Sequence, residues 1–516
     1  MHRRELLGFI SNARKRVGLQ GGRSKLLVQV GHCSMAVGAL EVLNDLRREV
    51  SDEIVVEESG CDGACFAGPK VFTSDNVFKA SRESLSEDLS FNWASGVSQK
   101  YISDQHRIAM KDIGNMSAVG LDDYLDKGGF IGLATALSLL SDDVLNIVEK
   151  SGLRGRGGAY FPVHLKWRSA LSVESANRVM VVNAEEGEPG IFKDRHLMEG
   201  APYRLIEGAL ISAFATGIKN IFLYVNAEAE LAYQRMKEAV DVSVREGFLG
   251  EGILGSDFSA NIKIIRGAGG YVCGEESTLL NTMEGKRREP RLRPPFPTES
   301  GYKNQPTIVN NVETLCNIPY ILSYGDDEFR KQGLDDCPGT KIVSLSGKVD
   351  NPGAIEVPMG TPIAEILRVF GGVEPEKLTG IAVGGPSSGI LPSEKSILPI
   401  RPGLIDDNSV MLGAGGIIAL GENRNIIDSV TSLAEYNSSE SCGKCTPCRE
   451  GTPRLLELLA LSKNESPNLN DELYKLANAI NQASLCGLGQ AAGNPILSLL
   501  HHFPGTVSHE SKAKGS

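Results

Sequence analysis

The sequence contains no hydrophobic run long enough to cross a membrane and no excess of basic residues. A membrane-spanning helix needs roughly 20 apolar residues, and no stretch of this chain approaches that length. The apolar run at residues 6–10 is too short for the core of a signal peptide. The formal net charge is −11, which gives no electrostatic reason to expect nucleic acid or acidic lipid as a partner. We therefore expect a cytoplasmic protein that is not itself inserted in a membrane.

Aromatic residues are also scarce, at 6% of the 516 residues, whereas 41% are hydrophobic and 23% are charged. Such proportions are typical of a globular protein, and the length predicts two to four domains. The ten cysteines are few but clustered, and in a reducing compartment clustering favours metal ligation over disulfides. Cys273, Cys316 and Cys337 stand alone and fit the role of small buried hydrophobic residues.

The first part of the chain predicts an α/β multi-domain protein. Residues 1–91 show a small βαβ pattern with cysteines at loop positions, which suggests a thioredoxin-like module. A polar connector with few apolar anchors follows at 92–119. Residues 120–335 alternate β-rich runs with longer helical stretches. This alternation favours a Rossmann-like parallel sheet covered by helices, with its ligand at the carboxyl ends of the strands.

The remaining part predicts two smaller units. Residues 336–422 contain strand-like runs, a Pro-Gly turn and a helical stretch at 361–370, which suggest a β-grasp domain. Residues 423–503 have leucines at helical spacing and predict a small bundle that carries the second cysteine group. A polar tail occupies 504–516.

The cysteines near the C-terminus form a C-x2-C-x2-C motif with a fourth cysteine further along the chain. Three closely spaced thiolates can wrap one corner of a cubane and the remote cysteine can close it, as in a 4Fe-4S cluster. Neighbouring glycines leave room for the inorganic core. The alternatives are a structural zinc site, which more often uses two separated cysteine pairs, and free thiols. The predicted ligands are Cys442, Cys445, Cys448 and Cys486.

Three glycine-rich or acidic loops suggest a second ligand site. The loop at 152–159 has four glycines and two arginines, which suits a phosphate or pyrophosphate, although a structural turn has a similar composition. The loop at 266–276 lies between a strand and a helical stretch. The loop at 183–190 places three carboxylates close together, at an electrostatic cost. They fit a ligand with ribityl or ribose hydroxyls; the alternative is a solvated acidic turn.

Together these motifs resemble the NADH-binding flavoprotein subunit of respiratory complex I and its soluble relatives, which include NAD-dependent hydrogenases, formate dehydrogenases and electron-bifurcating complexes. The resemblance rests on motifs that occur in the family's order: 155–167, 183–195, 267–297, 310–314 and the iron–sulfur motif 440–452. They span the chain from about residue 120 to 500.

The resemblance implies FMN, a 4Fe-4S cluster and NAD(H) as cofactors. The flavin would be held by Gly155, Arg156, Gly157, Gly158, Lys166, Asn183, Glu185, Glu186, Gly274, Glu275, Asn310 and Asn311. The nicotinamide dinucleotide would lie along Phe161, Glu188, Glu276 and Phe296. A hydride carries two electrons and a cluster accepts one, so a flavin must stand between them. No protein acid or base is needed, and no catalytic side chain is predicted.

The resemblance also implies a place in a hetero-oligomer. The function expected is electron transfer between NAD(H) and iron–sulfur clusters through FMN, as one component of a multi-subunit NAD(P)H:acceptor oxidoreductase. Its partners would be a ferredoxin-like 2Fe-2S subunit and a catalytic oxidoreductase subunit, with no nucleic acid among them.

Three departures from the family pattern bear on the nucleotide site. Tyr160 and His164 stand where the family has small residues, and their bulk could block the nicotinamide. Arg293 replaces the usual lysine and could reach the 2′-phosphate of NADP. The alternative function is therefore an electron-transfer or scaffold subunit that keeps FMN and cluster but has lost nicotinamide binding.

The N-terminal module resembles the thioredoxin-like ferredoxin that is often fused to this subunit. Cys61 and Cys65 match its second cysteine pair, but the first loop supplies only Cys33. A standard 2Fe-2S site takes four cysteines. Either His32 or Ser34 completes a variant cluster site, or the module is an empty docking scaffold.

Overall fold

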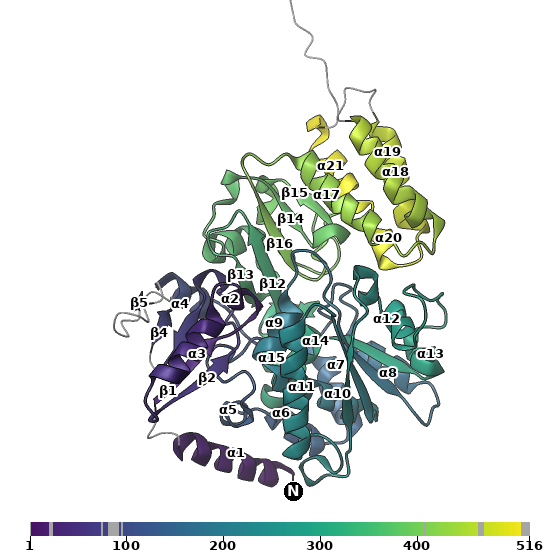
Figure 1. Cartoon of the computed structure of the whole chain (residues 1–516). Coiled ribbons are helices and arrows are strands. Elements are labelled where there is room, and N and C mark those ends of the chain that lie inside the picture. Colours follow the sequence, from purple (N-terminus) through teal and green to yellow (C-terminus); the bar gives the residue numbers. More distant parts are fainter. Residues whose placement is uncertain are drawn as a thin grey trace, which may run out of the picture.

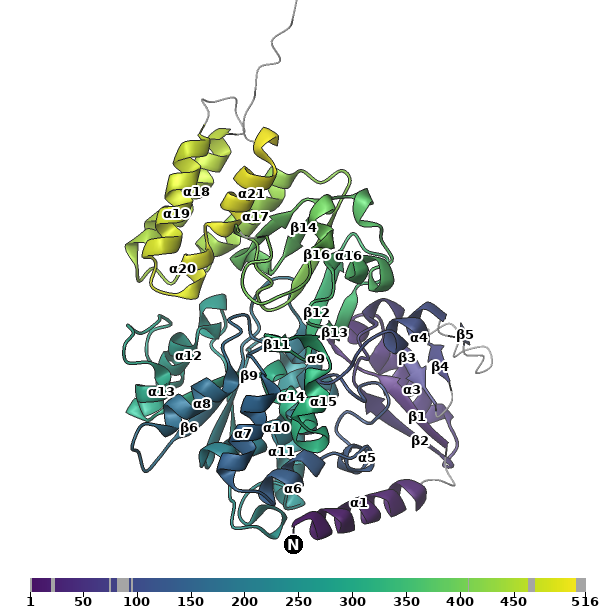
Figure 2. The ribbon, with the colours of Figure 1, turned by 180° about the vertical axis from the view of Figure 1, so that it is seen from behind.

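The computed structural model describes residues 2–19, 24–73, 76–80, 92–93, 96–406, 408–462 and 469–506. Within these ranges no helix is long and apolar enough to cross a membrane. Figures 1 and 2 show a central α/β unit with the N-terminal module against one side and a β-rich unit and a helical bundle stacked beyond one end. Residues 507–516 of the predicted polar tail lie outside the described residues.

The N-terminal module is a five-stranded sheet in the order β2-β1-β3-β4-β5, with β1 and β2 parallel and the other pairs antiparallel. A helix that the sequence patterns do not predict, α1, precedes it and buries Leu6 and Ile10 against α5 and α6 of the central unit. The elements are α1 (His2–Leu19), β1 (Ser24–Gln29), α2 (His32–Met35), α3 (Ala39–Glu49), β2 (Ile54–Ser59), β3 (Lys70–Phe72), β4 (Val77–Lys79), β5 (Asn92–Trp93) and α4 (Gly96–Ser103).

The segment after α4 has more buried apolar residues than its polar composition suggested. Ile108, Met110 and Ile113 are buried in the main core. The carboxylate of Glu356, in the β-rich unit, accepts hydrogen bonds from the backbone N–H groups of Ile108, Ala109 and Met110 at 2.7–3.0 Å. The apolar residues in this segment do not recur at the spacing of a helix or a strand. Their burial is therefore not predictable from the sequence pattern.

The central unit is built on a parallel sheet in the order β8-β7-β6-β9, as predicted. Helices cover the sheet, and their apolar faces form the largest core. The elements are α5 (Leu121–Asp126), α6 (Ile131–Leu137), α7 (Ser141–Ser151), α8 (Val163–Leu171), β6 (Val179–Ala184), α9 (Lys193–Gly200), α10 (Pro202–Thr216), β7 (Asn220–Val225), α11 (Glu230–Arg245), β8 (Asn261–Arg266), α12 (Glu276–Met283), α13 (Pro297–Ser300), β9 (Thr307–Asn311), α14 (Val312–Tyr324) and α15 (Asp326–Arg330).

The β-rich unit is a mixed sheet in the order β13-β12-β16-β14-β15, in which β12 and β16 are parallel. The predicted helix at 361–370 is present as α16 followed by a π-helical turn at Ile366–Phe370. The strands pack on a core of their own. The elements are β10 (Gly333–Leu334), β11 (Cys337–Pro338), β12 (Thr340–Gly347), β13 (Gly353–Pro358), α16 (Ile363–Glu365), β14 (Leu378–Val383), β15 (Gly389–Leu391) and β16 (Gly416–Gly421).

The C-terminal unit is helical, as predicted. Its long helices bury leucine, isoleucine and alanine side chains against one another and against Ile390 of β15. Cys442 and Cys445 lie between α17 and α18, Cys448 lies in the first turn of α18, and the fourth cysteine, Cys486, precedes α20. The elements are α17 (Ile426–Ser439), α18 (Thr446–Ser462), α19 (Asn470–Ala483), α20 (Gly487–Ala491) and α21 (Asn494–His502).

Candidate functional site

The carboxyl ends of the central parallel strands bring the predicted flavin residues together. β6 pairs with β9 so that Asn183 lies beside Asn311. The loop after β8 returns to the same edge, where the Asn183 side chain donates to the Gly274 carbonyl at 2.8 Å. Residues that are far apart in sequence therefore form one site at the sheet edge, which we call the flavin edge.

Two side chains at the flavin edge have polar atoms that are buried and without a hydrogen-bond partner. They are Glu185 Oε2 and Asn310 Nδ2. The other oxygen of Glu185 accepts from Asn226 Nδ2 at 2.5 Å, which fixes the orientation of the carboxyl group. A Cβ on Gly267 would meet Glu185 Oε2 at 2.7 Å, so glycine keeps this space open. One free acceptor and one free donor fit a ligand that carries both hydroxyl and carbonyl groups, as FMN does.

Burial changes the ionisation of the three clustered carboxylates. It raises the pKa of Glu185 to about 7, against the stabilising hydrogen bond from Asn226. Burial, followed by the nearby negative charge of Asp194, raises the pKa of Glu186 to about 7, and burial raises that of Glu188 to about 7. Burial, rather than the anticipated repulsion among the three carboxylates, is thus the main cause of the raised pKa values.

Two of the four predicted nucleotide residues, Glu276 and Phe296, lie around Arg293 at the exposed side of this edge. Lys166 Nζ lies 3.2 Å from Glu276 Oε2 and donates to the Val309 carbonyl at 3.0 Å. Arg293 forms ion pairs with Glu275 and with Glu276, the latter at 3.2 Å, and its guanidinium lies 5.9 Å from the centre of the Phe296 ring. Phe161 and Phe296 are 51% and 49% exposed, so their rings are available to stack on a ligand.

The four predicted cluster cysteines converge at the base of the helical unit. They pack together with Tyr271, Val272 and Leu488. The backbone N–H groups of Leu488 and Gly489 hydrogen-bond to the Cys486 thiol, which is the kind of support that cluster sulfurs need. A Cβ on Gly489 would approach Cys448 Cβ to 3.2 Å. The donor set and the glycine beside it fit a 4Fe-4S cluster.

One loop joins the flavin edge to the cysteine cluster. Tyr271 and Val272, which follow β8, contact the cysteines, whereas Gly274 contacts Asn183 at the flavin edge. The Tyr271 N–H donates to Glu440 Oε2 at 2.8 Å, and this glutamate immediately precedes the cysteine motif. We call residues 267–276 the bridging loop.

Comparison with known proteins agrees with this geometry. Family models match at three places: a Nuo51 FMN-binding domain at 148–320, an SLBB domain at 342–391 and the iron–sulfur binding region of NADH-ubiquinone oxidoreductase-F at 428–510. The NADP-reducing hydrogenase subunit HndC of Solidesulfovibrio fructosivorans is 41% identical over 403 residues, which cover 77% of this chain and 82% of that protein. The chain belongs to the family of complex I flavoprotein subunits.

Another member of this family and a solved structure show the same likeness. A subunit of the NADH-quinone oxidoreductase of Aquifex aeolicus is 39% identical, over 74% of this chain and 89% of that protein. An NAD+-reducing NiFe hydrogenase, solved in the H2-reduced state, matches with a TM-score of 0.67 and 27% identity over 94% of this chain and 84% of that chain. The chain is thus an oxidoreductase flavoprotein subunit.

Several family motif residues make hydrogen bonds within the fold. The guanidinium of Arg156 is fully buried and donates to the carbonyls of Thr340, Pro338 and Arg154. Glu275 accepts from the Thr278 N–H at 2.8 Å and caps α12. Asn311 caps α14, and Glu186 accepts from the first N–H groups of α9. These side chains position the loops that their family motifs define.

The two bulky departures from the family motif point away from the nucleotide residues. Tyr160 has a φ of 51°, in the region that favours glycine. Its ring is 3% exposed in the core of the β-rich unit, and its hydroxyl donates to the Gly413 carbonyl at 3.1 Å. His164 Nε2 faces Glu149 on α7, 3.9 Å away. Both side chains are therefore engaged by partners other than the residues predicted for the nucleotide.

A buried ion cluster that sequence patterns did not reveal supports the flavin edge. Glu313 at the start of α14 contacts Lys341 of β12 and lies 3.0 Å from Lys193 of α9, and all three are at most 1% exposed. Burial lowers the pKa of Lys341 to about 8, against the attraction of Glu313. The position of Glu313 in a family motif was the only signal, since its partners are remote in sequence.

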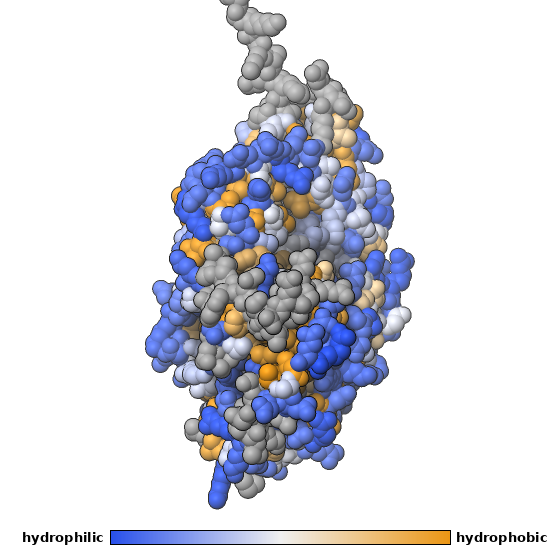
Figure 3. Space-filling model, turned by 60° about the vertical axis from the view of Figure 1, so that its left-hand side comes forward, coloured by the Kyte–Doolittle hydropathy of each residue, from blue (hydrophilic) through white to orange (hydrophobic). Residues whose placement is uncertain are grey.

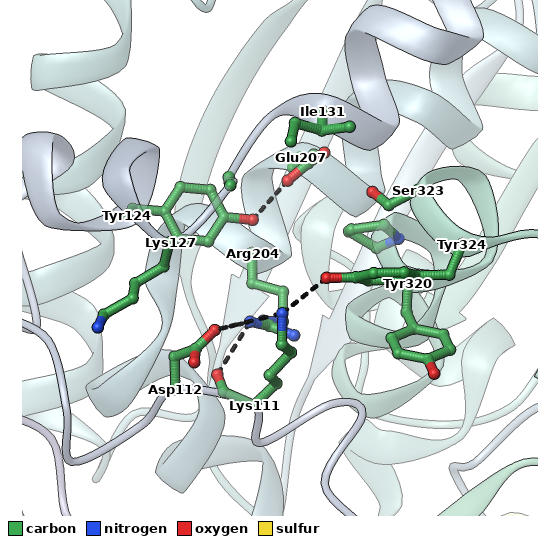
Figure 4. A pocket seen from close by; sticks show the side chains of 13 residues that line it. Lys111, Asp112, Tyr124, Lys127, Ile131, Arg204, Glu207, Tyr320, Ser323 and Tyr324 are labelled. Carbon is green, nitrogen blue, oxygen red and sulfur yellow. Dashed lines mark hydrogen bonds and ion pairs between the residues drawn. The ribbon is translucent and has the colours of Figure 1, made fainter. Parts of the chain in front are cut away.

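A cavity of about 100 Å³ lies elsewhere, between the segment after α4 and the helices α10 and α14 (Figure 4). Its polar groups are engaged: Glu207 accepts from the Tyr124 hydroxyl and the Phe130 N–H, and Lys111 donates to the Tyr324 hydroxyl at 2.9 Å. No candidate flavin or nucleotide residue lines it. We assign it no role in the reaction.

Proposed function

We propose that this chain carries electrons between NAD(H) and iron–sulfur clusters, with FMN at the flavin edge and a 4Fe-4S cluster on Cys442, Cys445, Cys448 and Cys486. The bridging loop is the observation that carries the proposal, because it contacts the flavin edge at Gly274 and the cysteines at Tyr271 and Val272. A single short loop between two redox sites suits rapid electron passage from one to the other.

The side chains would divide the binding task as follows. Glu185 and Asn310 offer their unpartnered atoms to the flavin, while the glycines at 155–158 and 267–270 allow its close approach. Lys166 would place a positive charge beside it. Phe161 and Phe296 would stack on the dinucleotide and exclude water, near Glu188 and Glu276. Bound FMN supplies the exchange between hydride and single electrons.

The nucleotide could be NAD(H) or its 2′-phosphorylated form, and we favour acceptance of both. Arg293 pairs with Glu275 and Glu276, so it offsets carboxylates that would otherwise repel a 2′-phosphate. The alternative of a subunit without nicotinamide binding rested on Tyr160 and His164, and both are turned away from the nucleotide residues.

The surrounding units would serve assembly. We propose a thioredoxin-like module at 1–91, a connector at 92–119, the FMN unit at 120–335, a β-grasp SLBB-like domain at 336–422, a cluster-binding bundle at 423–503 and a tail at 504–516. The sheet orders described above support these divisions. Relatives are named as subunits, which supports a hetero-oligomer with a ferredoxin-like subunit and a catalytic subunit.

The test is anaerobic purification of the full chain, followed by titration with NADH and then NADPH while the flavin absorbance is followed. We expect about four iron atoms per chain and stoichiometric bleaching by at least one nucleotide. A flavin that dithionite reduces but neither nucleotide bleaches would contradict the proposal. A matched control is Phe161→Ala, which should weaken nucleotide binding and leave flavin and iron content unchanged.

A further inference from the structure

The N-terminal module places three thiols in contact. Cys33 lies in α2, and Cys61 and Cys65 lie in the segment between β2 and β3. Cys61 Sγ and Cys65 Sγ are 3.8 Å apart, and Cys65 also hydrogen-bonds to Cys33. Cys33 is exposed, Cys61 is buried and Cys65 is partly exposed. Cys65 is therefore the thiol that touches both of the others.

The fourth position around these thiols is occupied by an amide. Gln29, at the end of β1, is fully buried and its Nε2 lies 2.8 Å from Cys61 Sγ, while its Oε1 has no partner. Ser34, which the sequence offered as a fourth ligand, accepts from the Gly31 N–H and donates to the Gln29 carbonyl. Its hydroxyl is thus occupied, and a carboxamide is a poor replacement for the soft thiolate that iron–sulfur clusters use.

The two cysteine groups of the chain are arranged differently. At the C-terminal site, Cys448 Sγ contacts the Ser441 hydroxyl at 3.2 Å, and within the described residues no hydrogen bond joins two of the four cysteines. In the N-terminal module, by contrast, Cys61 Sγ and Cys65 Sγ lie 3.8 Å apart and Cys65 also hydrogen-bonds to Cys33.

We propose that Cys33 and Cys65 form a thiol–disulfide exchange site that reacts with low-molecular-weight aliphatic disulfides. The Cys33 thiolate attacks one sulfur of the disulfide and releases one thiolate, forming a mixed disulfide. Cys65 then gives up its proton and attacks the Cys33 sulfur, forming the Cys33–Cys65 disulfide and releasing the second thiol. Two protein thiols are oxidised and one disulfide is reduced to two thiols, so electrons and atoms balance.

The position of this site links it to the central unit. The His32 N–H beside Cys33 donates to Glu199 Oε2 at 3.0 Å, and Glu199 lies near the end of α9. The start of α9 contacts Glu186 at the flavin edge through the Asp194 N–H at 2.7 Å. A helix of eight residues spans ~12 Å. His32, next to Cys33, and Glu186 at the flavin edge therefore contact opposite ends of one short helix.

The surface around Cys33 is open to small molecules. Met35, Val37 and Leu40, which follow it along the chain, are 36–59% exposed. The side of the molecule in Figure 3 is mainly hydrophilic, with hydrophobic areas scattered over it. A small disulfide reaches an exposed cysteine without any rearrangement of the module.

The experiment is treatment of the anaerobically purified full chain with glutathione disulfide, followed by alkylation of free thiols and peptide mapping by mass spectrometry. We expect a Cys33–Cys65 cross-link in the wild-type chain and in Cys61→Ser. Cys65→Ser should stop at a glutathione adduct on Cys33, and Cys33→Ser should form neither product. Buried Cys316 serves as an internal control that stays reduced, and flavin content reports that each variant is folded.

Two results would overturn the proposal. One is a wild-type chain, normal in flavin content, that forms no Cys33–Cys65 cross-link. The other is iron in excess of the C-terminal cluster, with a 2Fe-2S spectrum that persists in Cys442→Ser and disappears in Cys61→Ser. That pattern would assign the module to a three-cysteine variant cluster.

Discussion

Replacing Tyr160 with glycine should destabilise the protein and leave nucleotide binding unchanged. The ring is 3% exposed in the core of the β-rich unit, and loss of a large buried aromatic side chain costs about 3–5 kcal/mol. The residue has a φ of 51°, so relief of the left-handed conformation returns about 1–2 kcal/mol. The net loss of unfolding free energy is therefore about 1–4 kcal/mol.

The measurement pairs urea unfolding with an NADH titration of the flavin. Tyr160→Phe, which removes only the hydrogen bond to the Gly413 carbonyl, should lose about 1 kcal/mol. Phe161→Ala removes an exposed neighbouring ring and should show the reverse pattern, with weaker nucleotide binding and little change in unfolding. If Tyr160→Gly bound NADH at least tenfold more tightly and unfolded at the same urea concentration as wild type, the reasoning would be refuted.

Three further predictions test other parts of the structure. Glu313→Gln leaves Lys341 and Lys193 without their shared carboxylate and should lower the free energy of unfolding by about 3–5 kcal/mol. Lys341→Met keeps Glu313 beside Lys193 and should lower it by less, as measured by urea unfolding. Because the pKa of Glu185 is raised from 4.5 to about 7, its stabilising contribution is complete below pH 4.5 and is lost as the pH rises through 7. This contribution to the free energy of unfolding amounts to at most about 3 kcal/mol. In flavin-free protein, the free energy of unfolding should therefore fall less steeply between pH 5 and 8 in Glu185→Gln than in the wild type. Equal slopes for the two proteins would contradict the assignment. Gly489→Ala would press a methyl group on Ser484 and Cys448 and should lower the iron content while the flavin content is kept; full iron occupancy would show that the site is less tightly packed.

The sequence predicted the elements whose signals are local. The parallel strands of the central unit and the helices around the cysteine motif follow from apolar runs and leucine spacing. The convergence of Asn183, Glu185 and Asn310 was expected because carboxyl ends of parallel strands share one edge.

The directions in which side chains point were not predictable. Arg156 lies in a loop that suits phosphate, yet its guanidinium turns to carbonyls of the β-rich unit more than 180 positions away. Tyr160 was expected to obstruct a cleft, but a positive φ turns its ring into the neighbouring core. Both outcomes depend on how two units pack, and no local pattern encodes that packing.

The bridging loop also makes occupancy of the two cofactor sites mutually dependent. Because Tyr271 donates to Glu440 beside the cysteines while Gly274 contacts Asn183, order imposed on one end of the loop favours order at the other. Thermodynamic linkage requires that the factor by which a bound cluster tightens flavin binding equals the factor by which flavin tightens cluster retention. A chain that lacks its iron–sulfur cluster would therefore bind flavin more weakly, and loss of one cofactor would favour loss of the other.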